Sequence, residues 1–196
     1  ALARVIETTV LRYRNHPALD SWQLENEALN NQFGECVDFD GNRLAAELEL
    51  VKQLDPSRLV VMSLKNHHTF STRGPRPDIY ATSIYLIMHR HNRYARSWLP
   101  PWYQRLRSLH IRQVLRRPFF IHELQAEPWG PAGTQDLSRQ EQDRSMNPAR
   151  FRHAINYARR TGIEPVDLWG LEWWYYRRAR FGDEAMWQAA KALFKN

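Results

Sequence analysis

Two short apolar segments, each leading to a carboxylate, are the parts of this sequence best suited to do chemistry. The first, residues 21–27, ends at Glu27, and the second, residues 118–125, contains Glu123. Apolar and aromatic residues dominate both segments, as in a buried strand, and an unpaired carboxylate in such surroundings would destabilise the fold. Because proteins usually tolerate that cost at functional sites, the two segments predict a pair of acids that act across one cleft.

The composition is that of a globular protein with one sizeable core. The chain has 196 residues, of which 43% are hydrophobic and 25% charged, so we expect a single domain, residues 1–196. The formal net charge of +7 comes mostly from arginines spread over several predicted helices, with no run of about five like charges. This dispersed charge argues against nucleic acid as a partner.

The cysteine and hydropathy patterns require no oxidising compartment and predict no membrane partner. Cys36 is the only cysteine, so no disulfide can form within the chain. No apolar stretch approaches the roughly 18 residues that cross a bilayer, and the amino terminus has no signal-peptide pattern. Because the first residues already fit a helix, we expect a truncated amino terminus and leave the cellular compartment open.

Hydrophobic periodicity predicts five strands that alternate with helices. We expect helices over residues 2–15, 44–54, 99–116, 147–162 and 183–194, and strands over residues 21–27, 59–64, 78–85, 118–123 and 165–170. An aromatic loop is expected to follow the last strand as far as Tyr176. Nearly continuous apolar strands between helices are typical of parallel βα units, so the fold class is α/β.

Two α/β architectures compete for these five units, a doubly wound sheet and the later part of an eight-stranded barrel. A doubly wound nucleotide-binding fold should carry a glycine-rich turn after its first strand, yet residues 27–31 contain no glycine. In barrels, the active site is built at the carboxyl ends of the strands, which is where the unusual residues occur here. The barrel is therefore favoured.

In this register the sequence resembles the clan A glycoside hydrolases, retaining barrel enzymes that include families 5 and 42. Their pattern places Asn-Glu at the end of strand four, which Asn26-Glu27 matches, and Glu at the end of strand seven, which Glu123 matches. The segment Glu123-Leu124-Gln125 is also similar to a nucleophile segment of family 42 relatives. The resemblance implies a partial TIM (β/α)8 barrel corresponding to strands 4–8, with the first three βα units missing from this chain.

The resemblance also assigns roles in a double displacement. Glu27 would be the acid/base and Glu123 the nucleophile, with their carboxyl groups about 5–5.5 Å apart. Burial and mutual repulsion are expected to raise the pKa of Glu27 while Glu123 stays ionised. Asn26 would bind the sugar 2-hydroxyl, unless it only forms a turn. Tyr85 would donate to the nucleophile, unless it is a core tyrosine.

Further residues are expected to line the substrate cleft. Aromatic rings can stack on pyranose faces, and Trp169 is the preferred platform, although packing is the competing explanation for the other tryptophans. Glu127 is also the main rival to Glu123 for the role of nucleophile. The additional substrate-binding candidates are Trp129, Trp173, Asn66, His67, His89, Glu127 and Glu172. Neither a His-Glu-x-x-His pattern nor a second cysteine is present, so we expect no metal and no cofactor.

A barrel needs eight strands, and the five found here would leave two open sheet edges. We therefore expect a partner, either an amino-terminal half-barrel segment or a second chain. The resemblance also implies a carbohydrate substrate with a β-linkage. Three functions remain open: a retaining glycoside hydrolase, a carbohydrate-binding protein or inactive barrel fragment without turnover, and an arginine-rich polyanion binder.

Overall fold

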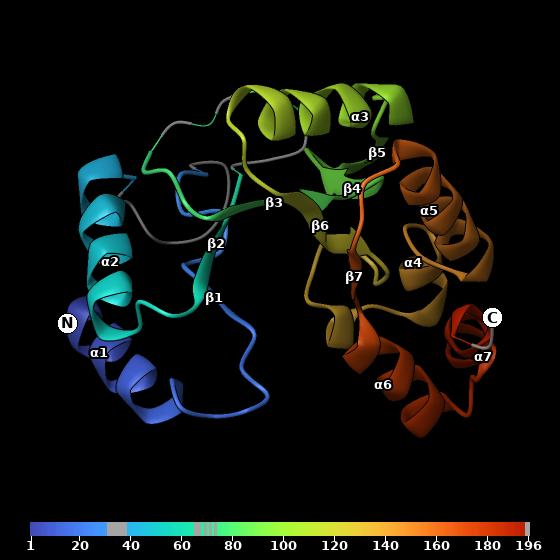
Figure 1. Cartoon of the computed structure of the whole chain (residues 1–196). Coiled ribbons are helices and arrows are strands. Elements are labelled where there is room, and N and C mark those ends of the chain that lie inside the picture. The colour runs from blue at the N-terminus through green and yellow to red at the C-terminus, as the bar shows by residue number, and fades with distance from the viewer. Residues whose placement is uncertain (31–38, 65–67, 69, 71, 73, 195–196) are drawn as a thin grey trace. The chain divides into compact units, whose positions relative to one another are not determined.

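The computed structural model describes residues 1–30, 39–64, 68, 70, 72 and 74–194, and it confirms the α/β class. Five strands form one sheet in the order β1-β2-β3-β6-β7 (Figure 1). Their bounds are β1 Ser21–Gln23, β2 Leu59–Ser63, β3 Ile79–Ile84, β6 Phe119–Gln125 and β7 Val166–Trp169. β1 pairs with β2, β2 with β3, and β6 with β7, always in parallel, as expected for part of a TIM barrel.

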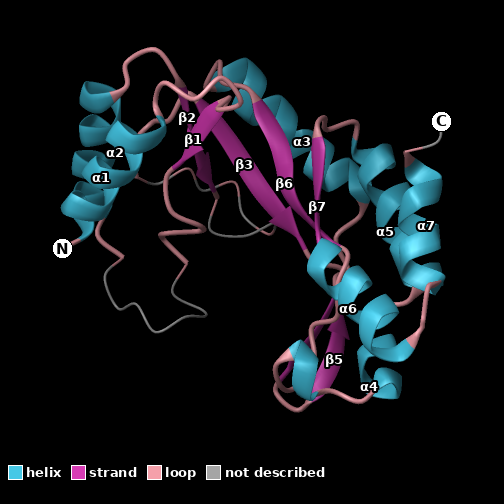
Figure 2. Ribbon diagram, turned by 90° about the horizontal axis from the view of Figure 1, so that it is seen from below, coloured by secondary structure: helices cyan, strands magenta, loops and turns pink. Residues whose placement is uncertain are grey.

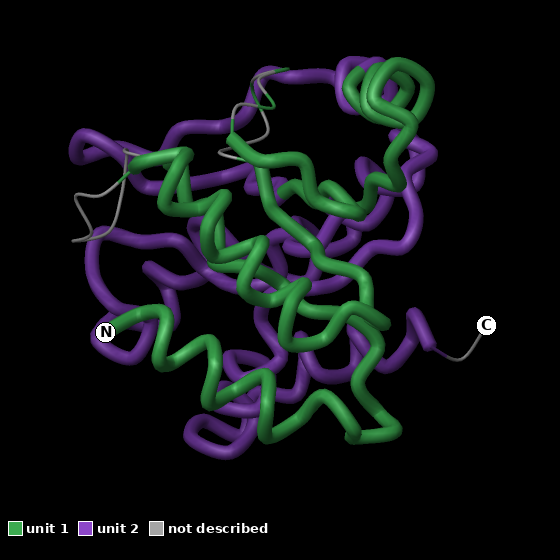
Figure 3. The backbone as a smooth tube through the Cα atoms, turned by 60° about the vertical axis from the view of Figure 1, so that its left-hand side comes forward, with its two compact units in different colours: residues 1–82, 107–120 green, residues 83–106, 121–196 purple. Residues whose placement is uncertain are grey.

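Contacts within the chain divide it into two compact units, which Figure 3 shows in different colours. Unit 1 contains residues 1–82 and 107–120, and unit 2 contains residues 83–106 and 121–196. The expectation of one catalytic domain over residues 1–196 stays a prediction. Among the described residues, no helix has the length and apolar character needed to cross a bilayer.

Unit 1 is built on two helices that pack against each other beside β1 and β2 (Figures 1 and 2). These are α1 Leu2–Tyr13 and α2 Gly41–Leu54, and α2 begins where the Asp40 side chain accepts a hydrogen bond from the backbone of Asn42. The core of this unit consists of Val10, Leu24, Leu44, Val51, Val60 and Met62. The apolar side chains that the helix and strand patterns predict to be buried therefore pack together in one core.

The helix expected over residues 99–116 is α3 Pro101–Leu109, continued by a π-helical turn at His110–Val114. Arg107 is 1% exposed and donates to Thr82 of β3 at 3.2 Å. Its guanidinium also lies over the ring of Phe119. A buried arginine needs such partners, and these contacts tie the end of α3 that belongs to unit 1 to β3 and Phe119.

Unit 2 contains an antiparallel hairpin to which the sequence analysis assigned no element. Its strands are β4 Ile87–Arg90 and β5 Arg93–Arg96, joined by His91 and Asn92. Both turn residues have positive φ angles, 48° and 60°, as a two-residue hairpin turn of the primed type requires. Asparagine accepts this conformation readily but histidine is a weaker signal, which is why the turn was missed.

The helices of unit 2 include one correction to the sequence analysis. They are α4 Arg139–Asp143, α5 Pro148–Thr161, α6 Leu171–Phe181 and α7 Ala185–Leu193, preceded by a 3-10 turn at Thr134–Asp136. The caps predicted for α5 are confirmed, since Asn147 accepts from two backbone amides and Gly162 adopts the left-handed conformation. The predicted aromatic loop is wrong, because these residues form α6. One face of α6 is buried by contacts with other parts of the chain, and such contacts cannot be predicted from the local sequence.

Gly170, between β7 and α6, allows a close approach of two backbone segments. Its φ angle is 146°, and a Cβ atom there would lie 2.6 Å from the carbonyl carbon and oxygen of Ala126. Ala126 immediately follows β6, so this glycine lets the ends of β6 and β7 meet. A side chain would both strain the local backbone and push the β6 exit away.

We predict that Gly170→Ala lowers the free energy of unfolding by about 2–4 kcal/mol, the combined cost of strain and overpacking. Urea unfolding followed by circular dichroism would measure the loss. Gly162→Ala is the matched control, because Gly162 also has a positive φ, 66°, but no atom within 4 Å of the added Cβ. The control should lose only about 1–2 kcal/mol. Equal losses in the two variants would contradict the close approach.

Candidate active site

Glu27 lies in a turn beyond the first strand and not at its end. The apolar pattern predicts a strand over residues 21–27, but β1 ends at Gln23. Glu25 and Glu27 both adopt left-handed conformations, with φ angles of 47° and 46°. Non-glycine residues with such angles are uncommon and store strain, often at functional sites. The structure thus corrects the strand boundary and places Glu27 on a strained turn.

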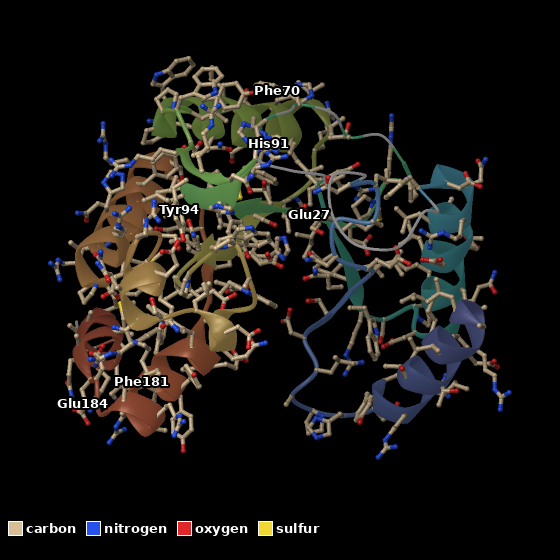
Figure 4. All side chains as sticks on the ribbon, turned by 180° about the vertical axis from the view of Figure 1, so that it is seen from behind. Glu27, Phe70, His91, Tyr94, Phe181 and Glu184 are labelled. Carbon is tan, nitrogen blue, oxygen red and sulfur yellow. The ribbon has the colours of Figure 1, made fainter. Side chains whose placement is uncertain are left out.

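Glu27, labelled in Figure 4, lies in a turn that hydrogen bonds within unit 1 hold. The residue is 8% exposed. The backbone amide of Glu27 donates to the Ser63 hydroxyl at 2.6 Å, and this hydroxyl lies 3.3 Å from Asn26 Oδ1. The Asn30 side chain donates to Glu27 Oε2 at 2.6 Å. Ser63, the last residue of β2, and Asn30, three residues after Glu27, were not identified from the sequence.

An ion-pair cluster supports the same turn from α2. Arg43 donates from Nη1 and Nη2 to the two carboxylate oxygens of Glu25, at 2.8 and 3.3 Å, and also pairs with Glu47. The hydrogen bond to Glu25 raises the pKa of Arg43, and burial raises the pKa of Glu47, whose Oε2 accepts no hydrogen bond from any described residue. The guanidinium of Arg43 binds both carboxylate oxygens of Glu25 and fixes its orientation. Glu25 directly precedes Asn26-Glu27, so this contact also supports the turn.

Glu123 lies inside β6, on unit 2, and accepts a hydrogen bond from the Tyr85 hydroxyl to Oε2 at 3.0 Å. Glu123 is 7% exposed and Tyr85 is 8% exposed. β6 continues to Gln125, but its pairing with β7 shifts: Ile121 faces Val166 and Leu124 faces Leu168. This irregularity places Glu123 in a β-bulge. Bulges redirect side chains and are common at barrel rims and beside active sites.

His122, within the same bulge, is a buried neutral imidazole that the sequence analysis missed. Its Nε2 lies 3.2 Å from the Ser83 hydroxyl, and its Nδ1 lies 3.8 Å from Glu123 Oε1. The second distance is too long for a hydrogen bond. Burial lowers the pKa of His122 to about 4, so the ring is uncharged at neutral pH. It therefore shapes the surroundings of Glu123 without adding a positive charge.

Gln125 holds the segment that follows Tyr85. Its Oε1 accepts from the backbone amides of Leu86 and Ile87, both at 2.9 Å, and its Nε2 donates to the Ile87 carbonyl at 2.6 Å. These three bonds fix the start of the β4–β5 hairpin against β6. Gln125 is 1% exposed, and a buried amide in an apolar strand was the sequence signal that could have identified it.

Glu127 and Trp169 are brought together at the ends of β6 and β7. The indole nitrogen of Trp169 donates to Glu127 Oε1 at 2.9 Å, while the Trp169 side chain is 49% exposed. Burial raises the pKa of Glu127, and the negative charges of Glu172 and Glu123 act in the same direction. The hydrogen bond orients the indole, so that an exposed aromatic face is held by a partly buried carboxyl group.

Trp129 completes the group of predicted residues that unit 2 gathers around Glu123. Its ring meets Tyr85 edge to face with the centroids 5.1 Å apart, and it is 36% exposed. Its backbone amide donates to the Ser145 hydroxyl. The hydroxyl donor to Glu123 is therefore packed against a partly exposed indole, which suits a binding cleft as well as it suits packing.

Other predicted site residues lie elsewhere. Trp173 is 2% exposed within α6, donates to Gln142 and lies under the guanidinium of Arg177, so its prediction as a sugar platform is wrong. Its burial follows from helix packing that a loop would not provide. His89 packs edge to face on Tyr94 within the hairpin. Glu172 is exposed in the first turn of α6. Asn66 and His67 lie outside the described residues.

Glu27 and Glu123 belong to different units, so the predicted separation of their carboxyl groups stays a prediction. Each unit by itself contains one of the two predicted catalytic carboxylates, buried and with a side-chain hydrogen-bond donor. Within the described part of the chain, no group of three histidine, cysteine or acidic side chains is arranged to hold a metal ion.

We predict that His122 makes the fold less stable in mild acid. Burial holds the pKa of His122 at about 4 against 6.5 for the free group, so the native state binds the proton more weakly than the unfolded chain does. The stability present above about pH 6.5 is therefore lost as the pH falls towards 4, by about 3 kcal/mol. Urea unfolding at several pH values would measure this slope.

His122→Gln keeps a polar group beside Ser83 and should remove most of this pH dependence. The control is His91→Asn, at the exposed turn of the hairpin, which should keep the full pH dependence (Figure 4). An unchanged slope in His122→Gln would show that other groups cause the acid sensitivity.

Comparison with known proteins places this geometry in a family. The family model described as glycosyl hydrolases family 2, TIM barrel domain, matches residues 1–136, which include Glu27 and Glu123. The match is therefore to glycosyl hydrolases family 2. It corrects the resemblance of the motifs to families 5 and 42. A crystal structure of an FMN-binding beta-glucuronidase from Facaelibacterium prausnitzii L2-6 is similar at 20% identity and a TM-score of 0.47.

That comparison covers 83% of this chain and 25% of the glucuronidase chain, so the present chain spans about a quarter of its length. No curated protein matches. The family model covers about two thirds of the 196 residues, and the chain belongs to the TIM barrel domain of glycosyl hydrolases family 2.

Proposed function

We propose that this chain carries the acid/base, Glu27, and the nucleophile, Glu123, of a retaining glycoside hydrolase. The observation that carries the proposal is the Glu123 site: a buried carboxylate in a bulge of β6 accepts a hydrogen bond from Tyr85. Membership in a glycoside hydrolase family supports the reaction class. Beyond the reaction class, we propose the retaining mechanism of clan A and the roles of the two carboxylates.

In this mechanism the Glu123 carboxylate attacks the anomeric carbon while the carboxylic acid of Glu27 protonates the leaving oxygen. The glycosidic bond breaks, and a covalent glycosyl ester with Glu123 forms. Glu27, now ionised, then removes a proton from a water molecule as its oxygen attacks the anomeric carbon. The bond to Glu123 breaks, so the carboxylate is regenerated and the sugar leaves with its original configuration. Tyr85 donates to Oε2 of the attacking carboxylate and orients it for the displacement.

The surroundings of Glu27 suit a group that must be positioned accurately. The carboxyl group is buried, and the Asn30 amide donates to its Oε2. Ser63 holds the backbone of the same residue, and Arg43 holds Glu25 two residues earlier. A catalytic group constrained through its main chain, its carboxyl group and its neighbour loses little orientational freedom when substrate binds.

Substrate binding is assigned to residues near the two carboxylates, with a β-linked pyranoside as the proposed substrate. Trp169 offers its exposed indole for stacking, and Glu127, which accepts from that indole, offers a carboxyl group to sugar hydroxyls. Asn26 is exposed beside Glu27 and would bind the 2-hydroxyl. Trp129, Glu172 and His89 are further proposed contacts, and no cofactor takes part in this chemistry.

The proposed partner is a segment or second chain that supplies further barrel strands. β1 and β7 are the outer strands of the described sheet, and each has one paired neighbour. In a closed barrel each would have two. A segment with three βα units would satisfy both edges, and hydrolysis is proposed for the barrel completed in this way.

We predict that a 2-deoxy-2-fluoro β-glycosyl fluoride forms a covalent adduct on Glu123 when the barrel is complete, because its glycosyl ester hydrolyses slowly. Mass spectrometry of the proteolysed adduct would locate it. Tyr85→Phe should lower the labelling rate by about 100-fold, as for the loss of one preorganised donor. Glu127→Gln, the matched carboxylate control, should still be labelled. An adduct on Glu127 would reverse the assignment.

The acid/base assignment has a separate test with azide as the nucleophile. Glu27→Ala should lose hydrolysis of glycosides with poor leaving groups and yield a β-glycosyl azide, since the covalent intermediate still forms. Glu123→Gly should yield the α-glycosyl azide by a single displacement. Product stereochemistry can be determined by NMR. Sugar binding without turnover in the unmutated completed barrel would instead identify a carbohydrate-binding protein.

A further inference from the structure

Unit 2 contains a pocket that the proposed hydrolase reaction does not use. It lies between the base of the β4–β5 hairpin, the beginning of α3 and one face of α5, and its volume is about 280 Å³. None of the proposed catalytic or substrate-binding residues lines it. It is close to the lower limit for small-molecule sites, which suits a compound with a single ring.

The floor of this pocket is apolar and fixed. Leu86, Ile87, Leu99 and Tyr157 line it and are each less than 10% exposed. The Tyr157 hydroxyl donates to the Leu99 carbonyl at 2.9 Å, and Gln125 binds the backbone of Leu86 and Ile87. Because hydrogen bonds hold these groups, a ligand would not have to order the floor as it binds.

The rim of the pocket is positively charged. Arg96 from β5, and Arg160 and His153 from α5, line it, and no carboxylate does. Arg144, Arg177 and Arg178 of the same unit all form ion pairs. In contrast, no described residue forms an ion pair or hydrogen bond with the side chain of Arg96 or Arg160. Their donors are available to a ligand.

Arg96 also lies close enough to Arg150, in the first turn of α5, for the two positive charges to repel each other. The pKa of Arg150 is lowered first by burial and then by the charge of Arg96, while Asp143 acts in the opposite direction. Two arginines that repel each other next to a pocket without acidic residues favour the arrival of an anion. Guanidinium groups suit this task, because they present paired donors to carboxylate or phosphate oxygens.

We propose that this pocket binds a small organic oxyanion, whose phosphate or carboxylate group meets Arg96 and Arg160 and whose apolar part rests on Leu86, Leu99 and Tyr157. Both kinds of headgroup share the chemistry that the rim recognises. The site is independent of Glu27 and Glu123, so it stands or falls separately from the proposed hydrolase function.

The test is calorimetric titration of the 196-residue chain with phenyl phosphate, benzoate, inorganic phosphate and benzyl alcohol. We expect saturable one-to-one binding of phenyl phosphate or benzoate, and the tighter of the two identifies the headgroup. Inorganic phosphate lacks the apolar part and benzyl alcohol lacks the charge, so each should bind at least about 10-fold more weakly. No saturable binding of either aromatic anion, or equal binding of benzyl alcohol, would overturn the proposal.

Arg96→Gln and Arg160→Gln should each weaken binding of the preferred anion by about 10-fold, because each removes a charge-assisted hydrogen bond. The matched controls are Arg93→Gln on β5 and Arg159→Gln on α5, two exposed arginines that do not line the pocket. The controls should change the affinity by less than about 2-fold at 0.15 M salt, where surface charges are screened. Equal losses in controls and rim variants would show general attraction to a basic surface.

Discussion

The arrangement of unit 2 depends on one contact, the hydrogen bond from the Tyr85 hydroxyl to the Glu123 carboxylate. Both side chains are buried, and a carboxylate removed from water without donors would strongly destabilise the fold. The pairing of β6 with β7 shifts between Ile121 and Leu124, and such a bulge changes the direction of the side chains within it, here that of Glu123. The bulge in β6 and the hydrogen bond from Tyr85 thus act together to make the burial of Glu123 possible.

The other polar side chains of β6 form hydrogen bonds with the neighbouring segments. Gln125 fixes the backbone after Tyr85, and His122, kept neutral by burial, meets Ser83. A buried network of this kind contributes to a unique structure only when its members have partners. The Gln125 bonds also hold the backbone of Leu86 and Ile87, which line the pocket, so the same amide supports two separate regions of unit 2.

Unit 1 solves a similar problem with backbone strain and ion pairing. The turn that carries Asn26 and Glu27 contains two residues with left-handed conformations, which glycine would adopt at lower cost. Contacts with Ser63 and Arg43 offset that cost. Residues held in such conformations by surrounding contacts are characteristic of functional sites, and this observation supports the role proposed for Glu27.

The sequence by itself determined the α/β class, the order of the five main strands and the caps of α5. It also singled out Glu123, Tyr85 and Trp169, which the structure shows in side-chain hydrogen bonds. Each rests on a local signal, such as periodicity, a capping residue or a recognisable motif. Only the tertiary structure decided that β1 ends at Gln23, that Trp173 is buried in a helix, and that a bulge surrounds Glu123. These features arise from contacts between residues far apart in the chain, and long-range packing overrides local preference.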